Sequence, residues 1–76
     1  MVNMEDLKKL LEDYMLEPDI TFGELKPYIL NEFKWNVDRM KKLEFIIRGK
    51  VIPNDMKVSD ILKTYLPMET LVVEEA

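Results

Sequence analysis

The part of the sequence that decides the fold runs Leu43-Glu44-Phe45-Ile46-Ile47-Arg48-Gly49-Lys50-Val51-Ile52, followed by Val58-Ser59-Asp60-Ile61-Leu62 and Leu71-Val72-Val73. Residues 45–48 are rich in strand-forming side chains and end at Gly49, which predicts a strand followed by a turn. Residues 51–53 are expected to form a short edge strand that Pro53 closes. A last strand is predicted over residues 70–74.

Helices are predicted on both sides of the strand at residues 45–48. After it, Ser59 or Asp60 is expected to cap a short helix that runs to about Tyr65. Before it, Thr21-Phe22-Gly23-Glu24 has the form of a capping box, so a longer helix should begin after Thr21 and run to about Lys34. Pro27 leaves two alternatives, a loose first turn or a helix that starts near Lys26. Residues 35–42 lose the apolar period, which predicts a linker or turn.

The N-terminal segment has the helical period. Its apolar residues recur at steps of three and four, with charged residues between them. They are Val2, Met4, Leu7, Leu10, Leu11, Tyr14 and Met15. Asn3 is suited to cap this helix and Pro18 to end it. We therefore predict a helix over residues 3–16.

From about residue 17 onward the chain resembles the ubiquitin-like domain family. The resemblance rests on Glu17-Pro18-Asp19-Ile20-Thr21-Phe22, Phe45-Ile46-Ile47-Arg48-Gly49-Lys50, Val58-Ser59-Asp60 and Thr70-Leu71-Val72-Val73, in that order. It implies an α+β, ubiquitin-like β-grasp fold in one domain, residues 1–76. Residues 1–17 would be a helical segment that replaces the family's first β-hairpin, and residues 18–76 the ubiquitin-like portion.

Two departures from the family carry consequences. The chain ends Val73-Glu74-Glu75-Ala76 without the di-glycine tail, so conjugation like that of ubiquitin is not expected. In the β-grasp sheet the last strand lies between the first and third strands. If the hairpin is replaced, residues 71–74 should expose an unpaired strand edge, open to a helix, a partner strand or a second copy.

The resemblance also points to a binding surface. Strand alternation places Phe45, Ile47, Leu71 and Val73 in the core, with the intervening side chains on the other face. Ile46 falls where ubiquitin displays its partner-binding isoleucine, and Glu74 replaces a valine of that patch. The candidate protein-binding residues are Ile46, Arg48, Gly49, Lys50, Val72 and Glu74. The alternative is that Ile46 and Val72 pack under the N-terminal helix. Trp35 and Tyr28 are interpreted as core residues or as interface anchors.

Composition argues against an enzyme. The 76 residues, 47% hydrophobic, suffice for one small domain. There is no histidine or cysteine, and Ser59 reads as a helix cap. Neither paired catalytic carboxylates nor a phosphate loop or zinc spacing is visible. We expect a chain that is not an enzyme and needs no cofactor and no metal.

The charge is uneven. Between residues 34 and 50 six basic residues stand against two acidic ones, a local charge of +4, which leaves −8 for the rest of a chain of net charge −4. This segment is either a solvated basic turn or a surface that faces an acidic partner. Nucleic acid is a less favoured partner at this net charge, and a membrane is not expected. With no apolar run long enough to cross a bilayer and no signal peptide, an intracellular location, cytoplasmic or nuclear, is expected.

The function that these features favour is a non-catalytic, non-conjugated protein-interaction or assembly module, an adaptor. It would dock through its sheet face or through the exposed edge of its last strand, to another protein or to a second copy. The alternative is a small helical structural subunit that dimerises through its N-terminal amphipathic helix.

Overall fold

A computed structural model describes residues 2–75; residues 1 and 76, at the ends of the predicted segments 1–17 and 18–76, lie outside the described residues. The elements are β1 (Val2–Asn3), α1 (Met4–Asp13), α2 (Phe22–Phe33), a 3₁₀ helix η1 (Val37–Lys42), β2 (Leu43–Ile47), β3 (Lys50–Val51), α3 (Val58–Thr64) and β4 (Thr70–Glu75). The four strands pair antiparallel in the order β1-β4-β2-β3. The α+β class is therefore as expected.

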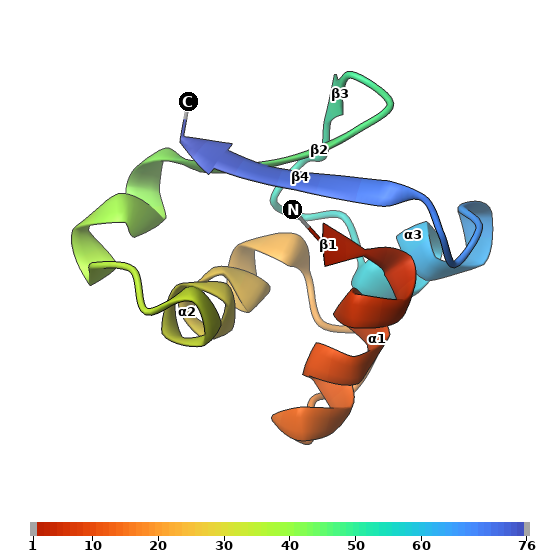
Figure 1. Ribbon diagram of the computed structural model, residues 1–76, viewed down its shortest axis with the longest axis horizontal. Helices are drawn as coiled ribbons and strands as arrows, with labels where there is room; N and C mark the ends of the chain where they lie inside the picture. The colour runs from red at the N-terminus through yellow and green to blue at the C-terminus, as the bar shows by residue number, and fades with distance from the viewer. Residues whose placement is uncertain (1, 76) are drawn as a thin grey trace.

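The helices lie on one face of the sheet and leave the other face open (Figure 1). From α2 onward the order is helix, 3₁₀ helix, strand, short strand, short helix and strand. At the N-terminus, the predicted helical segment contains α1, preceded by the two-residue strand β1.

Two capping boxes define where the longer helices begin. The Asn3 side chain accepts a hydrogen bond from the Asp6 N–H at 2.8 Å, and the Asp6 carboxylate accepts one from the Asn3 N–H at 3.1 Å. Thr21 and Glu24 make the same reciprocal arrangement at α2. Pro27 lies inside α2, so of the two alternatives the helix that begins directly after Thr21 is correct. Both starts follow from local sequence because each box spans four residues.

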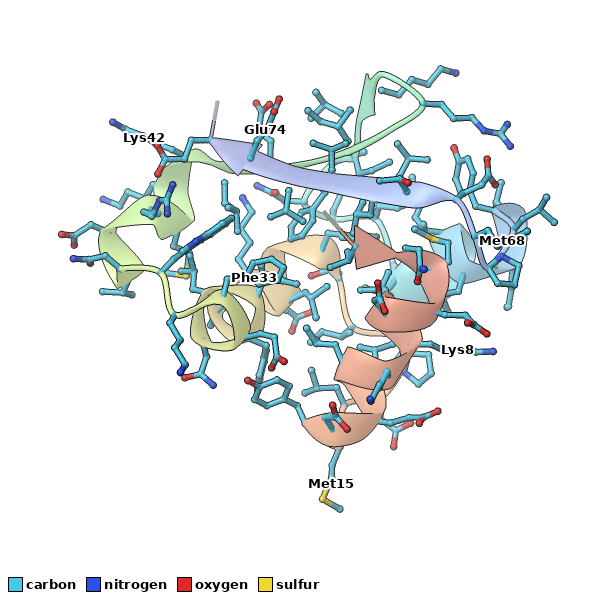
Figure 2. All side chains as sticks on the ribbon, viewed as in Figure 1. Lys8, Met15, Phe33, Lys42, Met68 and Glu74 are labelled. Atoms are coloured by element: carbon cyan, nitrogen blue, oxygen red, sulfur yellow. The ribbon has the colours of Figure 1, made fainter. Side chains whose placement is uncertain are left out.

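The core lies between the sheet and the helices. Its residues are Met4, Leu7, Leu10, Leu11, Phe22, Leu25, Ile29, Leu30, Leu43, Phe45, Ile47, Ile52, Val58, Ile61, Leu71 and Val73. Of the predicted N-terminal stripe, Met4, Leu7, Leu10 and Leu11 are buried within the chain, whereas Met15 lies beyond α1 and is exposed (Figure 2). Phe22 and Phe45 pack with ring centroids 5.0 Å apart, which joins α2 to β2 at the centre of the core.

Several sequence-based boundaries are wrong. Helix α1 ends at Asp13 rather than near residue 16, and β2 begins at Leu43 rather than at residue 45. Arg48 lies in the turn rather than in the strand, and the edge strand is Lys50–Val51 rather than residues 51–53. Helix α3 begins after Lys57, with no side-chain cap from Ser59 or Asp60. Its start is held instead by tertiary backbone bonds, from the Val58 N–H to the Ile20 carbonyl at 2.9 Å and from the Ser59 N–H to the Pro18 carbonyl at 2.8 Å.

The predicted linker at residues 35–42 contains η1. Its first turn is closed by the Asn36 side chain, which accepts from the Asp38 N–H at 2.9 Å. The apolar period is absent there because the segment has no fully buried residue. A 3₁₀ turn of this kind needs a local cap more than an apolar stripe.

The expected open edge of the last strand is only partly open. Strand β1 pairs with the start of β4, Val2 opposite Leu71 and Asn3 opposite Thr70. The residues before the N-terminal helix therefore do form a strand, although it has two residues. Among residues 2–75, no strand pairs with the second half of that edge, at Val73–Glu75.

Candidate functional site

The face of the sheet that the helices leave uncovered carries the candidate site. Alternation along β2 and β4 buries Leu43, Phe45 and Ile47 on the helix side, and Leu71 and Val73 with them. The intervening side chains point the other way. We call the outer face the set Glu44, Ile46, Val51, Val72 and Glu74. This assignment of inward and outward residues is the one that the sequence predicted.

The centre of the outer face is apolar. Ile46 lies directly opposite Val72 on one side and opposite Val51 on the other. Ile46 and Val72 are half-buried, whereas Val51 is 55% exposed. None of the three belongs to the core or to the side chains that pack against it. The alternative in which Ile46 and Val72 pack under the N-terminal helix is therefore wrong, because α1 lies against the opposite face.

One end of the outer face is acidic. Glu44 of β2 lies directly opposite Glu74 of β4. Figure 2 shows Glu74 pointing away from the helices, on the open side of the sheet. Like charges in directly opposed positions destabilise a sheet. A cationic group placed at this end would relieve the repulsion.

The other end of the outer face is the β2–β3 turn. Arg48 and Gly49 both have positive φ, 52° and 77°, in a two-residue hairpin connection between Ile47 and Lys50. This is the geometry of a type I′ turn, which matches the twist of the strands. The Lys50 side chain is exposed. The turn therefore fixes the backbone of Arg48, whereas Lys50 lies opposite the inward-facing Ile47 and so on the helix side of the sheet rather than on the outer face.

Arg48 also contacts two residues that sequence reasoning missed. Its Nε donates to the Glu69 carboxylate at 2.6 Å, and its guanidinium lies 5.0 Å from the centroid of the Tyr65 ring. The pKa of Glu69 is lowered, first because the Leu66 N–H donates to its carboxylate and further because of Arg48. No local pattern could have found this contact, since 21 residues separate Arg48 from Glu69.

The basic segment of residues 34–50 is divided in space. Arg39, Lys41 and Lys42 lie on η1, before β2, and Arg48 and Lys50 lie beyond its far end. Arg39 pairs with Glu75, whose pKa is lowered mainly by that hydrogen bond, and lies 4.3 Å from the centroid of the Trp35 ring. The sequence segment therefore does not form one continuous basic patch.

The two aromatic candidates lie away from the outer face. Trp35 is half-buried, with its ring centroid 5.0 Å from that of Phe33, and Tyr28 packs edge-on against Tyr14 at 5.3 Å. Both pack against the core. Of the two interpretations of Trp35 and Tyr28, core packing is the one that these contacts support.

Comparison with known proteins identifies no relative: no family model, no curated protein and no solved structure matches the chain. Among residues 2–75, no helix has the length and apolar character required to cross a membrane.

Proposed function

We propose that this chain is a non-catalytic protein-interaction module of the ubiquitin-like type that docks through its outer face. The observation that carries the proposal is the uncovered apolar group of Ile46, Val72 and Val51 on a sheet whose other face is fully used by the core. A rigid sheet presents these side chains without an ordering cost at the moment of binding. Its charged ends, Glu44 with Glu74 at one and Arg48 at the other, would set the orientation of the partner.

Two further routes that the sequence raised have weaker support. Strand addition to β4 has only the edge at Val73–Glu75 to use, and a charged pair, Arg39 with Glu75, blunts it. Dimerisation through the N-terminal helix would need an apolar stripe that instead packs into the core through Met4, Leu7 and Leu10. The outer face is therefore the better supported surface.

A photo-crosslinking experiment tests the proposal. A crosslinking amino acid is placed in turn at position 46, at position 72 and, as a control, at position 37 on η1, where Val37 is 67% exposed. We expect a discrete crosslinked protein from positions 46 and 72 in cell extract. Excess unlabelled wild type should abolish the product, whereas excess I46T/V72T should not. Threonine is chosen because it keeps the β-branched shape that strands favour while adding a polar hydroxyl.

The proposal fails if position 37 gives the same product, or if I46T/V72T competes as well as the wild type. A product whose mass is twice that of the chain would identify the partner as a second copy, still bound through the outer face.

A further inference from the structure

A groove of about 260 Å³ lies beside the beginning of β2, and neither Ile46 nor Val72 of the outer face lines it. Its walls carry three lysines from two elements, Lys26 of α2 with Lys41 and Lys42 of η1. Ile52, Pro53 and Asn54 line it from the segment that follows β3. We call this set of six residues the lysine groove.

Lys26 is the unusual member of the lysine groove. It is only 8% exposed, the one buried charged residue among those described, yet it makes no hydrogen bond or ion pair with any of residues 2–75. No buried side-chain nitrogen among the described residues lacks a partner, so the Lys26 ammonium reaches the surface and only its stem is buried. Burial of its methylene stem is an ordinary way to cover apolar surface. That alone does not account for two further lysines on the same groove with a single acidic residue, Glu44, in its lining.

The groove also borders an open stretch of strand edge. Strand β3 pairs only with Ile46 and Ile47 of β2, and the Ile52 N–H donates to the Phe45 carbonyl at 2.7 Å. Beyond Ile52, no backbone hydrogen bond to β2 is present among the described residues. Backbone groups alternate along a strand, so the Leu43 carbonyl faces the same side as that of Phe45. It has no backbone partner among the described residues.

The wall of the groove that Asn54 forms is held by a backbone hydrogen bond from α2. The Gly23 N–H donates to the Asn54 carbonyl at 2.8 Å, and a Cβ at position 23 would lie 3.1 Å from that carbonyl oxygen. The lysine groove is therefore a preformed feature, since helix α2 fixes both Lys26 and Asn54.

We propose that the lysine groove binds an acidic segment of another protein in an extended conformation. Carboxylates of the segment would contact Lys26, Lys41 and Lys42, and a backbone N–H would donate to the Leu43 carbonyl. Charge complementarity selects this occupant: three lysines against one carboxylate in the lining, beside a strand edge that accepts a backbone donor. The site goes beyond the outer face and shares two residues with it, Glu44 and Val51.

Binding of a short fluorescein-labelled peptide with alternating Glu and Val, followed by anisotropy, tests this inference. The matched control peptide has Gln in place of Glu. We expect saturable binding of the Glu peptide at low salt, none of the Gln peptide, and marked weakening in about 0.5 M salt. Amide shifts in the bound protein should concentrate at Lys42, Leu43 and Asn54.

Variants of the protein assign the binding to the groove. K41Q/K42Q, at two exposed positions that do not support the core, should weaken the Glu peptide by about threefold to thirtyfold. K26M should abolish its binding, and K63Q, which removes an exposed lysine from α3, should leave it unchanged.

Equal binding by the wild type and K41Q/K42Q would overturn the inference, as would equal binding of the Glu and Gln peptides. Tighter binding of a single-stranded RNA oligonucleotide through the same lysines would overturn it in favour of a nucleic acid. I46T/V72T should bind the Glu peptide normally, so failure at the groove and failure at the outer face are distinguishable.

Discussion

At the scale of single residues, the hairpin turn requires a left-handed backbone conformation at Gly49. Gly49 has φ +77°, and a Cβ built there would have no atom within 4 Å. A substitution by alanine therefore adds left-handed strain and no clash. We expect G49A to lower the free energy of unfolding by about 1–2 kcal/mol in urea titrations. K50A, next in the chain and exposed, is the control and should change it by less than about 0.5 kcal/mol. Equal effects of the two substitutions would contradict the turn geometry.

At Lys26 we expect a substitution to stabilise the fold rather than to destabilise it. The Lys26 ammonium reaches the surface beside Lys41 and Lys42, while its stem is buried. Methionine keeps the length of the apolar stem and removes the repulsion between these cations. K26M should therefore raise the free energy of unfolding by about 1 kcal/mol, which raises Tm by about 4–8 °C in a domain of this size. K63M on α3 is the exposed control. A loss of stability in K26M would show that the ammonium is satisfied within the fold, contrary to the role inferred for it.

At the scale of elements, helix starts separate local from tertiary causes. Asn3 and Thr21 cap their helices through side-chain hydrogen bonds. Helix α3 begins instead at Val58, with no capping hydrogen bond from the Ser59 side chain. N3A and T21A should each cost about 0.5–2 kcal/mol of unfolding free energy. S59A, the matched control, should stay within about 0.5 kcal/mol. Loss of more than that in S59A would restore Ser59 as the cap that the sequence suggested.

Strand β4 pairs with β2 along one edge, and its other edge is open at Val73–Glu75. The direction of the backbone N–H groups shows which residues face each edge. The Phe45 carbonyl accepts a hydrogen bond from the Ile52 N–H, so the backbone N–H and C=O of Phe45 face β3. Because these groups alternate along a strand, the backbone N–H and C=O of Glu44 and Ile46 face β4. Their partners Glu74 and Val72 therefore face β2. In amide hydrogen exchange, the N–H groups of Val72 and Glu74 should be protected and those of Val73 and Glu75 should exchange quickly. Protection at Val73 and Glu75 would mean that a second chain covers this edge.

At the scale of the whole molecule, three carboxylates couple stability to pH. Glu24, Glu69 and Glu75 each have a pKa below the ordinary 4.5, mainly because of hydrogen bonds from the Thr21 N–H, the Leu66 N–H and Arg39. A carboxyl with a lowered pKa in the folded state stabilises it above the unfolded pKa. That contribution is lost as pH falls through the lower, folded value.

The midpoint of urea unfolding should therefore be level above about pH 4.5 and fall below it. E24Q/E69Q/E75Q should be less stable than the wild type at neutral pH, and its midpoint should change less on acidification. If the midpoints of the two proteins fell equally as the pH is lowered, groups other than these three carboxylates would determine the acid sensitivity.

What the sequence determined by itself was local: the two capping boxes, the helical period of α1, the glycine turn and the alternation that separates core from outer face. Each involves residues within a few positions of one another, where spacing alone specifies geometry. The outward placement of Ile46 and Val72 followed from that alternation. Tertiary structure decided the start of α3, the pairing of β1 with β4, the Arg48–Glu69 contact and the lysine groove. These depend on segments brought together only by burial of the common core, which no local pattern encodes.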